Sequence, residues 1–71
     1  MVGNTGVRIL VADDHDVVRR GICELLVRQS GWKVCGEASN GVELVEKARE
    51  LKPDVVIVDL GMPRLNGIEA A

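Results

Sequence analysis

The order of elements in this chain predicts an α/β fold with a doubly wound parallel sheet. Two short runs, ILVA at residues 9–12 and VVIV at residues 55–58, are apolar without alternation. Such runs are typical of strands that are buried on both faces. Two amphipathic segments with helical spacing and one weakly patterned strand lie between them. The predicted order is therefore β-α-β-α-β, followed by the beginning of another helix.

The first strand and the first helix are expected at residues 7–12 and 16–29. Apolar residues recur at helical spacing and would face the sheet, while charged residues would face solvent. The apolar stripe is Val18, Ile22, Leu25 and Leu26, and the charged side is Arg19, Arg20, Glu24 and Arg28. Asp14 or Asp16 is placed to cap the helix, and residues 30–31 end it.

The second half of the chain also predicts a strand followed by an amphipathic helix. A strand at residues 32–38 is followed by a helix that begins at Asn40 and is closed by Pro53. Asn40 and Glu43 have the spacing of a capping box. The apolar stripe of this helix is Val42, Leu44, Val45, Ala48 and Leu51. Residues 54–60 form the third strand, 61–67 a loop rich in turn formers, and 68–71 the start of a third helix.

Three carboxylates directly follow the two apolar strands. Asp13 and Asp14 come after the first run, and Asp59 comes after the second. Neighbouring parallel strands end at the same edge of a sheet, about 5 Å apart, so these side chains would converge on one site. Like charges at that distance need a cation among them, and an all-oxygen site with room for water suits Mg²⁺. Taken singly, each acid is explained as well by a helix cap or a turn.

His15 stands next to the paired acids. We interpret it as a turn residue that precedes the helix, with a metal ligand or a phosphate donor as the alternatives.

The length and net charge of the chain limit the classes of protein to which it can belong. Seventy-one residues with a net charge of −2 and a pI near 5.2 allow one small domain and offer no basic stripe to nucleic acid. No apolar run approaches the length of a membrane span, and the first residues do not resemble a signal peptide. We expect a cytoplasmic domain at residues 7–71, after a disordered lead-in at residues 1–6, that has no contact with a membrane.

The paired acids and the residues from Asp59 onward resemble the receiver domain of bacterial two-component response regulators. The stretch 59–67 reads DLGMPRLNG, and it follows Asp13 and Asp14 in the same chain. Residues 9–22 and 36–41 are most similar to the NarL/FixJ (LuxR-type) class, whose members join a receiver to a DNA-binding helix-turn-helix domain. The resemblance covers residues 7–71. It implies a flavodoxin-like (CheY-like) fold with strand order 2-1-3-4-5, of which this N-terminal portion ends after strand three and the start of helix three.

The resemblance also implies roles for four residues. Asp59 would be the phosphoacceptor, whose carboxylate attacks phosphorus. Asp14 would bind Mg²⁺ directly, Asp13 through water, and Gly61 through its backbone carbonyl. The phosphodonor would be a sensor histidine kinase. The chain would then serve phosphorelay signalling rather than act as an enzyme, in a parent protein that regulates transcription and contacts DNA only through a domain outside residues 1–71.

Two alternatives remain open at this point. In the family, a Ser or Thr after strand four and a Lys after strand five contact the phosphoryl group, and neither element lies within residues 1–71. One alternative is a receiver-like interaction module that is not phosphorylated. The other is a Mg²⁺-dependent phosphohydrolase that forms an aspartyl-phosphate, a class that typically carries Asp-x-Asp after strand one. An open edge on the third strand also predicts self-association of these 71 residues.

Overall fold

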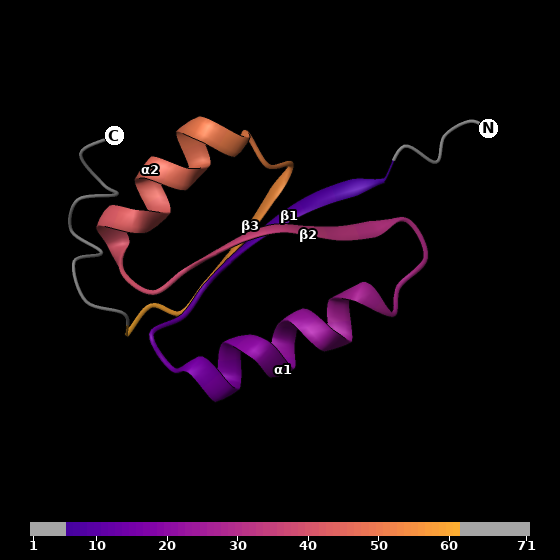
Figure 1. Cartoon of the computed structure of the whole chain (residues 1–71), viewed down its shortest axis with the longest axis horizontal. Coiled ribbons are helices and arrows are strands. Elements are labelled where there is room, and N and C mark those ends of the chain that lie inside the picture. Colours follow the sequence, from indigo (N-terminus) through magenta and orange to yellow (C-terminus); the bar gives the residue numbers. More distant parts are fainter. Residues whose placement is uncertain (1–5, 62–71) are drawn as a thin grey trace.

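The computed structural model describes residues 6–61. Its elements are β1 (Val7–Ala12), α1 (Asp16–Val27), β2 (Trp32–Ala38), α2 (Gly41–Leu51) and β3 (Val55–Val58), as shown in Figure 1. The three strands are parallel and form one sheet in the order β2-β1-β3. This arrangement confirms the predicted α/β class and strand order. Most of the expected lead-in, the loop after residue 61 and the start of a third helix lie outside the described residues.

Strand β1 is the centre of the sheet and of the core. It pairs with β2 from Val7↔Trp32 to Ala12↔Ala38, and with β3 from Ile9↔Val55 to Ala12↔Val58. Residues 9–12 are buried, as the apolar run predicted, and Leu10 and Val11 have no exposed surface. Pairing on both sides and packing on both faces therefore fix the place where β1 ends.

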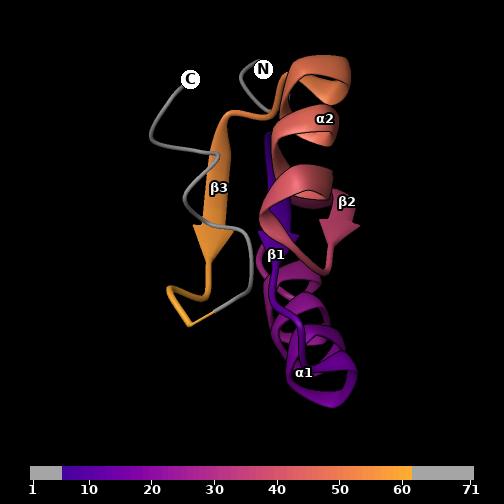
Figure 2. The ribbon, with the colours of Figure 1, turned by 90° about the vertical axis from the view of Figure 1, so that its left-hand side faces the viewer.

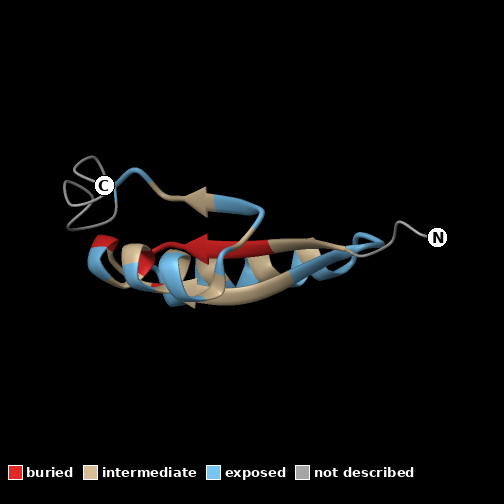
Figure 3. Cartoon of the chain, turned by 90° about the horizontal axis from the view of Figure 1, so that it is seen from above, coloured by how far each residue is buried: buried red, intermediate tan, exposed pale blue. Residues whose placement is uncertain are grey.

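The expectation that β3 is buried on both faces is wrong. Val55 and Val56 remain 43% and 38% exposed. The reason is that, among residues 6–61, β3 pairs with β1 alone, while α1 and α2 both pack against β1 and β2. Figure 2 shows β3 standing beside the helix-covered part of the sheet, and Figure 3 shows the start of β3 exposed next to a buried β1. The strand is also shorter than the predicted span of residues 54–60.

The two helices lie on opposite faces of the sheet (Figure 1). Helix α1 begins one residue after His15, which occupies the N-cap position without a side-chain cap, so neither Asp14 nor Asp16 caps it as expected. Its predicted apolar stripe is partly wrong, because Val18 and Leu25 are exposed. The residues of α1 that are partly buried are Arg19, Ile22, Cys23 and Leu26. No helix among residues 6–61 has both the length and the apolar character needed to cross a bilayer.

The predicted capping box of α2 is confirmed, except that the Glu43 side chain binds Ser39 rather than the backbone of Asn40. The Asn40 side chain accepts a hydrogen bond from the Glu43 backbone N–H at 2.9 Å. The Glu43 carboxylate reaches back to Ser39, whose backbone N–H and hydroxyl donate to it at 2.8 and 3.0 Å. At the other end, Lys52 adopts a left-handed conformation directly before Pro53, which ends the helix where the sequence predicted.

The substitution E43Q should destabilise the fold at neutral pH and have little effect at acid pH. The pKa of Glu43 lies below its usual value, chiefly because the Ser39 backbone N–H donates to its carboxylate. A lowered pKa in the folded state stabilises the protein above the unfolded value near 4.5, and this contribution is lost as the pH falls through the folded value. We expect a difference of about 0.5 kcal/mol in the free energy of unfolding at neutral pH.

Urea unfolding of the wild type and of E43Q, followed by circular dichroism at about pH 7 and about pH 3, measures this difference. A difference of the same size at both pH values would show that the charged carboxylate is not its source.

Candidate functional site

Three carboxylates and one imidazole gather at the carboxyl end of the sheet. One oxygen from each of Asp13, Asp14 and Asp59 and one nitrogen of His15 lie within 4.8 Å of one another. We call these four residues the acidic cluster. The cluster lies between β1 and β3, where the strand order changes direction, and open α/β sheets bind their ligands at this point. The predicted convergence of the three acids is therefore present in the structure.

Main-chain hydrogen bonds place the two strand ends next to each other. The Asp59 N–H donates to the Ala12 carbonyl at 2.9 Å, and the Asp13 N–H donates to the Ala38 carbonyl at 3.0 Å. Because Ala12 and Val58 are partners in the register, the residues that follow them leave the sheet side by side. The backbone thus brings the carboxylates together in spite of their charge.

Asp13 is the buried member of the acidic cluster, with 5% of its surface exposed. Its Oδ1 accepts a hydrogen bond from the His15 backbone N–H at 2.8 Å and lies 2.9 Å from the His15 ring nitrogen Nδ1. The backbone hydrogen bond from His15 is the largest cause that lowers the pKa of Asp13 below its usual value. Asp13 is therefore a buried carboxylate that stays ionised.

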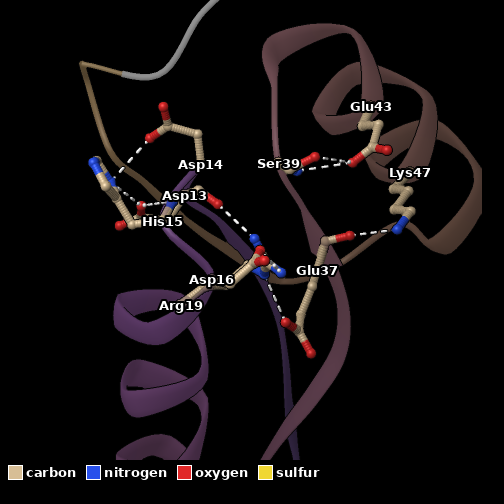
Figure 4. A network of polar contacts seen from close by, with 9 residues as sticks. All are labelled: Asp13, Asp14, His15, Asp16, Arg19, Glu37, Ser39, Glu43 and Lys47. Atoms are coloured by element: carbon tan, nitrogen blue, oxygen red, sulfur yellow. Dashed lines mark hydrogen bonds and ion pairs between the residues drawn. The ribbon is translucent and has the colours of Figure 1, made fainter.

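His15 lies between the acids rather than only in the turn. Its Nδ1 is 2.9 Å from Asp13, 3.0 Å from Asp14 and 3.7 Å from Oδ2 of Asp59. Its contacts with Asp13 and Asp14 are drawn in Figure 4. The hydrogen bond with Asp13 and then the charge of Asp14 raise the pKa of His15. The imidazole thus stands where a cation would offset the three negative charges.

The two oxygens of Asp59 have different surroundings. Oδ1 accepts a hydrogen bond from the Gly61 backbone N–H at 2.9 Å, and Oδ2 faces His15. A methyl group added at Gly61 would lie 3.5 Å from Asp59 Oδ1, an ordinary contact, so an alanine would fit there. The role expected of the Gly61 carbonyl as a metal ligand stays a prediction.

The donor set of the acidic cluster fits a hard divalent cation. It offers three carboxylates and contains no thiolate. Asp14 and Asp59 keep about a third of their side-chain surface exposed, at 33% and 30%. Beside the His15 nitrogen, the three carboxylates form a partly open set of oxygen donors, which suits Mg²⁺ because this ion keeps several of its waters when it binds.

The sequence pattern predicts the wrong orientation for one helix residue near the acidic cluster. Arg19 was expected to face solvent, but its side chain is only 13% exposed. It pairs with Glu37 of β2 and with Asp16 of its own helix. The three-residue spacing of Asp16 and Arg19 was a signal for the second pair, but nothing in the sequence indicates the first, because Glu37 is 18 residues away.

Several of the proteins that this chain is similar to are response regulators. Residues 9–71 match the family model of the response regulator receiver domain. The chain is 53% identical over 64 residues to response regulator GacA of Pseudomonas viridiflava, which covers 90% of this chain and 30% of that protein.

Two solved structures agree with this match. A LuxR-family two-component response regulator from Aurantimonas sp. SI85-9A1 superposes with a TM-score of 0.80 at 39% identity, covering 83% of this chain and 42% of that chain. RcsB from Salmonella enterica serovar Typhimurium, solved bound to promoter rprA in the presence of the phosphomimetic BeF₃⁻, superposes with a TM-score of 0.77 at 33% identity. The match covers 82% of this chain and 47% of that chain.

These matches fix the family but span only part of each relative. The chain covers 30% of the length of GacA and less than half of each of the two solved chains. The family match includes every residue of the acidic cluster. The chain therefore belongs to the response regulator receiver domain family, the signalling domains of two-component systems, and shares their flavodoxin-like fold.

Proposed function

We propose that Asp59 accepts a phosphoryl group from the phosphohistidine of a sensor histidine kinase, with Mg²⁺ held by the acidic cluster. The observation that carries this proposal is the convergence of Asp13, Asp14 and Asp59 within 4.8 Å at the carboxyl end of the sheet. Family membership supports it, because the chain matches the receiver domain over residues 9–71.

The chemistry assigned to Asp59 is nucleophilic attack by a carboxylate. A bond forms between a carboxylate oxygen and phosphorus, the bond between phosphorus and the histidine nitrogen breaks, and the electron pair leaves with that nitrogen. Oδ2 is the oxygen available for attack, since Oδ1 is engaged by the Gly61 N–H. Mg²⁺, when bound, would neutralise charge on the phosphoryl oxygens. Asp13, Asp14, Asp59 and the carbonyl of Gly61 are the groups proposed to hold it.

The two other functions are less well supported. A receiver-like module that is not phosphorylated would have no need to bring three carboxylates together at one edge. A phosphohydrolase is disfavoured because the match is to a family of signalling domains. The adjacent acids Asp13 and Asp14 also differ from the Asp-x-Asp pattern of that class.

The parent protein is proposed to be a cytoplasmic transcription regulator. Support comes from RcsB, which was solved bound to a promoter, and from the LuxR-family regulator that shares this fold. DNA contact would be made by a domain outside residues 1–71, because these residues carry a net charge of −2.

Phosphoryl transfer can be tested with acetyl phosphate as the donor. We expect a Mg²⁺-dependent phosphate adduct on Asp59, located by mass spectrometry of proteolytic fragments, and no adduct in D59N. Its occupancy should be low, because no lysine among residues 6–61 forms an ion pair with the three carboxylates and could offset the added charge.

The matched control is D54N, which makes the same substitution at the opposite end of the strand, where Asp54 accepts a hydrogen bond from the Arg8 backbone N–H. An adduct that persists in D59N, or that is lost equally in D54N, would contradict the assignment of Asp59.

Self-association of residues 1–71 through β3 is the second part of the proposal. The outer edge of β3 has no partner strand among the described residues, and Val55 and Val56 are exposed. Backbone donors and acceptors on an apolar edge pair readily with another chain. We expect sedimentation at micromolar concentration to show a dimer or larger species, and V56K to shift it toward monomer. A folded wild-type monomer under these conditions would refute this part.

A further inference from the structure

Arg19 links the acidic cluster to the neighbouring strand. Each of its three guanidinium nitrogens donates to a different acceptor, as Figure 4 shows. Nε donates to Glu37 Oε1 at 2.7 Å, Nη1 to the backbone carbonyl of Asp13 at 2.8 Å, and Nη2 to Asp16 Oδ1 at 2.8 Å. The Arg19 side chain is 13% exposed; its bonds to Glu37 and to the Asp13 carbonyl are partly buried, and its bond to Asp16 is exposed.

The hydrogen bond from Arg19 to the Asp13 carbonyl helps to hold the Asp13–Asp14 segment in place. The Asp13 N–H is already bound to the carbonyl of Ala38 in β2, and its Oδ1 accepts from the His15 backbone N–H. Arg19 binds the remaining main-chain group, the carbonyl that leads to Asp14. The direction in which both paired carboxylates leave β1 is thereby tied to β2 and α1.

Glu37 is held in turn from the other face of the sheet. The Lys47 ammonium of α2 donates to the backbone carbonyl of Glu37. An arginine guanidinium is always charged in proteins, and the hydrogen bond with Glu37 is the largest cause that raises the pKa of Arg19 further. Because Glu37 and Asp16 together offset that charge, Arg19 can bind the Asp13 carbonyl without repelling a cation at the acidic cluster.

We propose that Arg19 is a positioning residue for the cation site: its guanidinium fixes the Asp13–Asp14 segment against Glu37 and so orients the carboxylates that hold Mg²⁺. This inference rests on the proposed function, because it assumes a cation at the acidic cluster. The three acceptors are bound by three separate nitrogens of a planar fork, a geometry that the single nitrogen of a lysine does not reproduce.

The test uses R19K, which keeps the positive charge and the apolar stem. R19K should weaken Mg²⁺ affinity about tenfold, the effect expected when a residue that orients a metal ligand is lost. Calorimetric titration of the chain with Mg²⁺ measures the affinity, and urea unfolding without metal measures stability separately. R20A, an exposed substitution one residue further along α1, is the matched control and should bind Mg²⁺ like the wild type. Unchanged Mg²⁺ affinity in R19K would overturn the proposal, because a merely structural arginine is rescued by lysine.

A metal-free measurement separates this inference from the proposed function. The backbone ¹⁵N–¹H resonance of Asp14 reports on the Asp13 carbonyl, and it should move in R19K and in E37Q before any Mg²⁺ is added. An unmoved Asp14 resonance in both variants would refute the role of Arg19, whereas equal Mg²⁺ binding by wild type and D59N would refute the cation site itself. E37Q also carries the affinity test if R19K does not fold, with weakened Mg²⁺ binding in support and unchanged binding against.

Discussion

The double pairing of β1 is the constraint on which the site depends. β1 binds β2 on one side and β3 on the other, and its residues 9–12 are buried. A slip of one residue in either register would exchange the side chains of β1 that face α1 for those that face α2. The same register sets the Asp59 N–H on the carbonyl of Ala12 and the Asp13 N–H on the carbonyl of Ala38. Core packing therefore decides where the carboxylates lie, and the chemistry of the site follows from the fold.

Bringing three negative charges together has a cost that the structure offsets locally. The imidazole of His15 lies among the acids, and backbone N–H groups of His15 and Gly61 donate to Asp13 and Asp59. These donors engage particular oxygens, and the hydrogen bond from the His15 backbone lowers the pKa of Asp13. Asp59 keeps Oδ2 directed toward the other acids, with no main-chain donor on it within residues 6–61. The arrangement distinguishes a buried, fixed carboxylate at Asp13 from a more open one at Asp59.

The sequence predicts correctly the features that depend on residue spacing within one helix or strand. It does not predict the features that depend on which other element packs against that helix or strand. The spans of β1 and β2, the capping box of α2 and the convergence of the acids follow from local spacing and from parallel strand ends. The side of α1 that faces the sheet does not follow from local spacing. The pattern therefore predicts that Leu25 is buried and that Arg19 faces solvent, and both predictions are wrong. Burial of β3 depends on the elements that cover it, and both helices pack on β1 and β2. The partner of Arg19 lies on another strand, beyond the reach of sequence spacing.

The central claim is that Asp13, Asp14 and Asp59 bind one cation, and a Mg²⁺ titration followed by NMR tests it most directly. We expect the backbone resonances of these three residues and of Gly61 to shift together with a single dissociation constant. The Trp32 indole, at the opposite end of β2, should not move. Replacement of Mg²⁺ by paramagnetic Mn²⁺ should broaden the same four resonances and leave Trp32 sharp. Separate midpoints for Asp13 and Asp59, or broadening that includes Trp32 equally, would contradict a shared site.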